Sequence, residues 1–156
     1  MRIGKRSHIA FEWSKDATAP TLVNMHFYLG ERLMADEPIY VPTYLHAYQN
    51  LLRQLQQGFF EFDQFETPEQ AYKTLLTERA TDERPFFRYL FKVDETLDSY
   101  MIFLFQKMEE CCFVWTCWDA QRCNADHQWN VIYTIQLPQD ALMTIIRTLL
   151  DQLEKL

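Results

Sequence analysis

Three segments near the N-terminus alternate apolar and polar side chains with a period of two, which is typical of strands with one buried face. The first covers residues 7–13 and the second residues 22–29. The third, at residues 32–34, follows a tight turn that Gly30 and Glu31 can close. We therefore expect the chain to begin with short antiparallel strands.

Three other segments have the helical period instead. Pro42 and Gly58 bound the first of them, in the order typical of a helix start and a helix end. The second begins at a capping box in residues 67–70, with proline at the first helical position, and ends near Ala80. The third follows Pro138 and has the most regular apolar face in the chain. The pattern thus predicts about three helices.

Further strands are expected in the second half of the chain. They cover residues 86–93, 99–108, 111–118 and 129–137. An acidic turn at residues 94–98 and a polar loop at residues 119–128 separate them. The sum is an α+β fold, with one domain over residues 1–156. We expect an antiparallel sheet of about five to seven strands with about three helices packed on one side.

Composition excludes several classes of ligand. The chain has 156 residues, of which 48% are hydrophobic and 24% charged, as in ordinary globular proteins. Its three glycines are too few for a phosphate-binding loop, so we expect no nucleotide cofactor. The net charge of −7 disfavours nucleic acid as a partner. The acidic excess is greatest in residues 58–100, with ten acidic and five basic side chains. Such a surface suits a basic protein partner.

No segment of the sequence has the character of a membrane span or a signal peptide. The longest strongly apolar run, Tyr100–Phe105, has six residues, whereas a span needs about 20. No apolar region follows the basic N-terminus. The four cysteines lie within 13 residues, unlike a spread disulfide framework, so we expect free thiols and a cytoplasmic protein.

Metal binding and catalysis are both disfavoured by residue spacing. Cys117, Cys123 and His127 do not have a common zinc spacing and lack an obvious fourth ligand, so we expect no metal. A hydrolase using a cysteine–histidine pair, or paired carboxylates such as Glu109 and Glu110, is an alternative. These glutamates lie at a predicted turn, where solvated charge is the ordinary explanation. We therefore expect that the protein is not an enzyme.

The most unusual segment, residues 59–66, interleaves four phenylalanines with three acidic residues. A strand or loop cannot bury all four rings and keep the three carboxylates hydrated. Exposed aromatic rings can anchor a partner while acids steer its approach. We therefore assign Phe62, Asp63, Phe65 and Glu66 to a partner-binding surface. The alternative is an edge strand with Phe60 and Phe62 packed under the helices.

Two further segments extend this hypothesis. Asp94 and Glu95, in the acidic turn, are expected to contribute to the same kind of surface. Trp118 lies on the opposite face of its predicted strand from Trp115, which makes Trp118 the better candidate for a surface contact. Core packing is the alternative for these indoles, including Trp129 on the last predicted strand.

The order of these features resembles the immunity-protein-42 family of bacterial polymorphic-toxin systems. The resemblance lies in the opening segment Ile3–Trp13, the strand and Gly-Glu turn at residues 27–31, and the amphipathic helix at residues 43–57. It continues in the apolar strand with Trp115 and the closing helix after Pro138. It does not extend over the acidic stretch at residues 59–100.

The resemblance implies an immunity protein that neutralises a cognate toxin by direct contact, without catalysis. The negative charge favours a toxin with a basic surface. We expect a monomer or a homodimer, because exposed strand edges or aromatic patches could pair two copies. The alternatives are an adaptor or chaperone-like binding module, and the cysteine or carboxylate hydrolase considered above.

Overall fold

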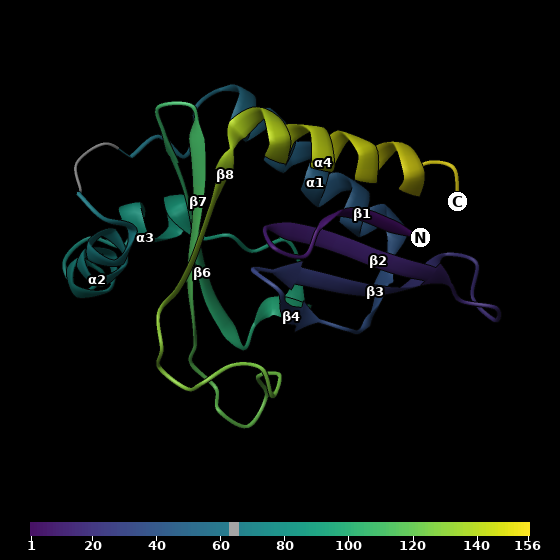
Figure 1. Ribbon diagram of the computed structural model, residues 1–156, viewed down its shortest axis with the longest axis horizontal. Helices are drawn as coiled ribbons and strands as arrows, with labels where there is room; N and C mark the ends of the chain where they lie inside the picture. The colour runs from purple at the N-terminus through teal and green to yellow at the C-terminus, as the bar shows by residue number, and fades with distance from the viewer. Residues whose placement is uncertain (63–65) are drawn as a thin grey trace.

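The computed structural model describes residues 1–62 and 66–156, in which eight strands form two antiparallel sheets (Figure 1). The first sheet has the order β1-β2-β3-β4, and β5 also pairs with β3. Its strands are β1 (Arg2–Lys5), β2 (Ile9–Lys15), β3 (Leu22–Leu29), β4 (Arg32–Ala35) and β5 (Pro38–Tyr40). The second sheet has the order β6-β7-β8. Its strands are β6 (Tyr100–Lys107), β7 (Glu110–Cys117) and β8 (Tyr133–Pro138).

The helices form two groups. Helices α1 (Val41–Gln56) and α4 (Gln139–Leu153) lie side by side, and the ring of Tyr48 on α1 meets Phe11 on β2 at 5.4 Å. Helices α2 (Pro68–Glu78) and α3 (Arg84–Tyr89) pack on the second sheet, where the ring of Tyr72 lies 5.4 Å from that of Phe103. A short 3-10 helix, η1 (Glu95–Leu97), leads into β6. Figure 1 shows the two groups on different sides of β6–β8.

The expected α+β class is confirmed, and the numbers of strands and helices are close to those expected. The strands divide between two sheets, and β6 of the second sheet buries side chains on both of its faces. Ile102, Phe103, Leu104 and Phe105 are consecutive and all buried. A strand of this kind must be covered from both sides, so the second sheet lies inside the molecule.

The strand expected at residues 86–93 is wrong, because residues 84–89 form helix α3. Pro85 occupies the start of this helix, where its fixed φ and missing N–H are tolerated. Phe86 and Tyr89, three residues apart, share the buried side of the helix. The expected strand at residues 129–137 begins late, at Tyr133, so Trp129 lies in a loop. Strands β1 and β5 were not anticipated.

Candidate functional site

Acidic side chains from separate loops line one cleft, which we call the acidic cleft. Its volume is about 610 Å³, and its walls come from the β4–β5 turn, η1 and the loop that follows β7. The four carboxylates that line it belong to Asp36, Glu37, Glu95 and Asp98. Arg122 also lines the cleft. Segments more than 80 residues apart in sequence therefore build one negatively charged surface.

The negative charge of the acidic cleft is only partly compensated. Lys92 Nζ lies 3.0 Å from a carboxylate oxygen of Asp98, and Arg122 Nε lies 4.0 Å from one of Asp119. Within the described parts of the chain, none of the ion pairs involves Asp36, Glu37 or Glu95. The cleft can therefore attract a cationic group.

The two predicted residues of the acidic turn have different roles. The carboxylate of Asp94 accepts a hydrogen bond from the backbone N–H of Thr96 at 2.9 Å and another from the Thr96 hydroxyl. Asp94 therefore caps η1 and is half-buried. Glu95, the next residue, is exposed and lines the acidic cleft. Of the pair, Glu95 is the one that is exposed to solvent.

Trp118 is exposed beside the acidic cleft. Its side chain is 53% exposed and lines a groove of about 200 Å³ together with Phe87, which is 54% exposed. Asp98 and Tyr100 line both this aromatic groove and the acidic cleft. The backbone N–H of Trp118 donates to Ser99 O at 3.2 Å. An exposed aromatic side chain thus lies next to a cluster of negative charge.

Phe62 and Glu66 lie at the other end of β6. Both line an apolar groove of about 320 Å³ between α2 and the β6–β7 hairpin, where Phe105 and Lys107 are their neighbours. Phe105 is five positions along the strand from Tyr100, which corresponds to about 16 Å. The predicted residues that can be placed therefore belong to two surfaces. Asp63 and Phe65 lie outside the described residues.

The aromatic segment before Asp63 is largely packed against the core, as the alternative interpretation expected. Phe60 is buried, and the ring of Phe62 stacks on that of Phe105 at 4.8 Å and meets that of Tyr89 at 4.6 Å. Gln106 holds this segment through backbone hydrogen bonds, from Gln106 N to Phe60 O at 2.7 Å and from Phe62 N to Gln106 O at 3.0 Å. Phe62 is therefore half-buried, whereas Glu66 is exposed.

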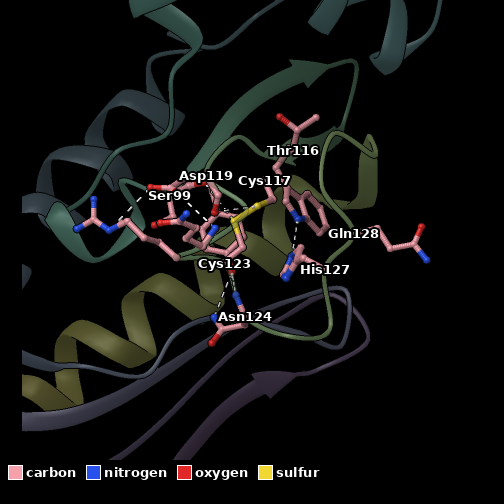
Figure 2. Close-up of a disulfide and its surroundings, with 12 residues drawn as sticks. Ser99, Thr116, Cys117, Asp119, Cys123, Asn124, His127 and Gln128 are labelled. Atoms are coloured by element: carbon pink, nitrogen blue, oxygen red, sulfur yellow. Dashed lines mark hydrogen bonds and ion pairs between the residues drawn. A yellow bond between two sulfur atoms is a disulfide. The ribbon is translucent and has the colours of Figure 1, made fainter.

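The expectation of free thiols is wrong for two of the four cysteines. Cys117 and Cys123 form a disulfide (Figure 2). Cys111 and Cys112 are free. Cys117 is the last residue of β7, and the chain turns back so that Cys123 lies beside it. The pairing depends on this turn, which the close spacing of the cysteines alone does not specify.

The 118–132 loop, which joins β7 to β8, connects the two sheets through hydrogen bonds. Asn124 Nδ2 donates to Leu33 O at 2.8 Å, and Leu33 N donates to a carboxylate oxygen of Asp126 at 2.8 Å. Leu33 belongs to β4 of the first sheet. The Asn124 backbone N–H donates to the hydroxyl of Tyr100, on β6 of the second sheet, at 2.9 Å. The loop therefore positions one wall of the acidic cleft.

The two free thiols are poorly suited to nucleophilic chemistry. Burial raises the pKa of Cys111 and of Cys112 to about 12, so both are protonated at neutral pH and cannot act as thiolates. Cys117 and Cys123 are bonded to each other.

In the part of the chain that the structure describes, no group of three or more His, Cys, Asp or Glu residues is arranged to hold a metal ion. No helix there has the length and hydrophobicity to cross a membrane.

Sequence patterns missed part of this surface. Asp36 and Glu37 are adjacent acids after a predicted strand, a signal that could have been used. Trp115 is buried, as core packing requires, but the same interpretation is wrong for Trp129, which is 64% exposed. Trp129 forms an isolated bridge with Cys117 in the 118–132 loop instead of continuing β8.

Comparisons with known proteins identify a similar fold. No family model and no curated protein matches the chain, so the resemblance to the immunity-protein-42 family stays a prediction. Among solved structures, CdiI from Burkholderia dolosa AUO158 is similar, with a TM-score of 0.70 and 16% sequence identity. The match covers 97% of this chain and 99% of CdiI. At this identity, the likeness establishes that the two chains share a fold.

Proposed function

We propose that this protein is an immunity protein that binds and neutralises a cognate bacterial toxin by direct contact. The observation that carries the proposal is the likeness to CdiI along almost the full length of both chains. CdiI is an immunity protein of contact-dependent growth inhibition. The resemblance of the sequence to another toxin-immunity family supports the same role. The proposed activity is binding, without catalysis, and the proposed compartment is the cytoplasm.

The partner surface that fits best is basic. Asp36, Glu37 and Glu95 have no cationic partner among the described residues, so they favour a lysine- or arginine-rich surface. Uncompensated charge of this kind mainly accelerates association, whereas buried aromatic contacts slow dissociation. Trp118 is placed to supply the aromatic contact. In the proposed interface, Glu95 and Trp118 are therefore the main contacts, and Asp94 supports Glu95 by capping η1.

The groove near Phe62 is a second contact surface in this proposal. Glu66 and Met108 are exposed around it, and Met108 is the most exposed large hydrophobic residue among those that the structure describes. Asp63 and Phe65 belong to the same segment of sequence. An adaptor or chaperone-like module would use such an apolar groove for a client segment. Because the groove and the acidic cleft lie at opposite ends of β6, charge reversal can test them separately.

The first experiment expresses the adjacent upstream open reading frame in cells, with and without this protein. The proposal expects that its product kills the cells, that this protein restores growth, and that the two co-purify. A harmless neighbour, or killing that this protein does not relieve, contradicts the proposal. Co-purification with a folding client instead of a toxin would favour the adaptor alternative.

The second experiment locates the interface by charge reversal. Glu95→Lys should weaken toxin binding if the acidic cleft is used, and paired Asp63→Lys and Glu66→Lys should weaken it if the groove is used. Asp151→Lys, on the exposed side of α4, is the matched control for added positive charge. Unchanged affinity in both test variants would exclude both surfaces.

A further inference from the structure

The disulfide lies at the start of the 118–132 loop, which connects the two sheets through hydrogen bonds. Cys123 immediately precedes Asn124, whose side-chain amide reaches Leu33 O at 2.8 Å and the Tyr100 hydroxyl at 3.1 Å. Cys117 is buried at the end of β7, so its position is set by the sheet. The disulfide therefore fixes the position of Cys123, and with it the neighbouring Asn124, whose side chain bonds to β4. Figure 2 shows Asn124 directly beyond the disulfide.

His127 is covered and packs between the rings of Tyr100 and Tyr133, but other contacts of the 118–132 loop are polar and lie near the surface. Asp126 is exposed and bonds to Leu33 N at 2.8 Å, and the exposed Gln128 donates its backbone N–H to the Tyr133 hydroxyl at 2.8 Å. Each such hydrogen bond contributes only about 1 kcal/mol to stability. A covalent link at the base of the loop removes conformational freedom that these bonds would otherwise have to overcome.

We propose that the Cys117–Cys123 disulfide is a redox site that controls this loop, and that its substrate is a protein dithiol reductant. Cys123 is the more accessible residue of the pair, since it is half-buried whereas Cys117 is buried. A thiolate of the reductant attacks Cys123 Sγ, forms a mixed disulfide and releases Cys117 as a thiolate, which takes up a proton. The second thiol of the reductant then displaces Cys123, so the reductant leaves as a disulfide, having given up two electrons.

Reduction has a defined structural consequence. Without the disulfide, residues 118–132 are covalently linked only at their two ends, to β7 and β8, and the bonds of Asn124 and Asp126 to Leu33 open more often. Arg122 and Asn124 line the acidic cleft, so its wall moves with the loop. Disulfides in reducing compartments are usually transient and redox-sensing, which fits an exchangeable bond at this position. The reducing compartment and the effect on a toxin both rest on the proposed function, whereas the structural consequence of reduction does not.

The test compares the oxidised and the dithiothreitol-reduced protein by amide hydrogen exchange. On reduction, the amides of Leu33, Asn124 and Gln128 should exchange about tenfold faster or more. The amides of Trp13 and Phe91 bond to Met1 O and Ile102 O, outside the loop, and should not change. The double variant Cys117→Ala/Cys123→Ala should reproduce the reduced pattern without reductant. Cys112→Ala, which removes a free thiol, should behave as the unaltered protein does.

Three results would overturn the proposal. The first is four titratable thiols in the denatured, air-oxidised protein, which would mean that the disulfide does not form. The second is unchanged exchange of the loop amides on reduction. The third is faster exchange of the amides of Trp13 and Phe91 as well, because the disulfide would then stabilise the whole fold. A toxin affinity that differs between the oxidised and reduced forms would extend the switch to the proposed function. Since the exchange measurement needs no toxin, failure of the immunity role leaves its result intact.

Discussion

The indole Nε1 of Trp115 donates a hydrogen bond to Nε2 of His127 at 3.1 Å. Nε2 must therefore be unprotonated, and Nδ1, which lies 2.8 Å from a carboxylate oxygen of Asp126, carries the proton. The imidazole is covered and packs between the rings of Tyr100 and Tyr133. Because the bond from Trp115 needs a free lone pair, the folded protein holds His127 neutral.

This arrangement makes stability depend on pH below neutrality. Burial lowers the pKa of His127 from its ordinary value of 6.5, and nearby Arg32 acts in the same direction, although Asp126 opposes them. Below pH 6.5 the unfolded chain binds a proton at His127 more readily than the folded protein does, so the free energy of unfolding falls. Urea unfolding at pH 7.5 and pH 5.5 measures this loss.

The matched variant for this prediction is His127→Gln, which can still accept from Trp115 but does not titrate. The unaltered protein should lose more stability between pH 7.5 and 5.5 than this variant, since carboxylates elsewhere contribute equally to both. Equal losses would mean that His127 does not contribute to the pH dependence.

Gly4 offers a second stability test. Its φ is +81°, and a Cβ added there would lie 2.2 Å from the backbone oxygen of Ile9. Gly4 pairs with Ala10 in the β1–β2 ladder, so this oxygen cannot retreat without distorting the ladder. Gly4→Ala should therefore lower the free energy of unfolding by about 2 kcal/mol or more. Chemical denaturation measures the change.

Gly58→Ala is the control for Gly4. Gly58 also has a positive φ, of +66°, but a Cβ there would meet the flexible side chain of Glu61, which can move aside. Gly58→Ala should therefore lower the free energy of unfolding only through backbone strain, by about 1 kcal/mol. If both variants lower the free energy of unfolding by the same amount, the contact between the added Cβ and Ile9 O does not destabilise the protein.

Periodicity was a good guide where only one face of an element is buried. The strand at residues 22–29 was predicted with the bounds of β3, and the helix after Pro138 was anticipated because α4 buries a single apolar face. The pattern misled where the chain is apolar on several sides. Around Phe86 the aromatic residues favoured a strand, and only the proline before it and the spacing to Tyr89 indicated a helix.

The candidate site was less accessible to prediction from sequence. Glu95 and Trp118 could be picked out because acidic turns and residues on polar strand faces tend to be exposed. Their proximity to Asp36 and Glu37 depends on the folding of η1 against the β4–β5 turn. The disulfide also depends on tertiary folding, since the loop after Cys117 must turn back before Cys123 can reach Cys117.

Gln106 provides a third stability test, because it is a buried polar residue with several partners. Its side-chain oxygen accepts from the Phe60 backbone N–H at 3.1 Å, and its amide donates to Leu55 O at 2.9 Å. Gln106→Met keeps the volume but leaves the Phe60 N–H without an acceptor, whereas Leu55 O retains its bond from Gly58 N. One unsatisfied buried donor costs about 1–3 kcal/mol, measurable by denaturation. Gln136→Met, at an exposed position of β8, should change stability by less than about 0.5 kcal/mol.

The last prediction separates the two contributions to toxin binding in the proposed interface. Glu95→Lys reverses an exposed charge, so it should mainly lower the association rate and weaken its dependence on salt. Trp118→Ala removes an aromatic contact, so it should mainly raise the dissociation rate, with an affinity loss of about tenfold or more. Surface plasmon resonance at low and high salt resolves both rates, with Asp151→Lys as the control for charge. Suppose that Trp118→Ala leaves the dissociation rate unchanged while Glu95→Lys lowers the association rate. The acidic cleft then attracts the toxin, but the aromatic groove lies outside the contact, because loss of an aromatic side chain from the contact would raise the dissociation rate.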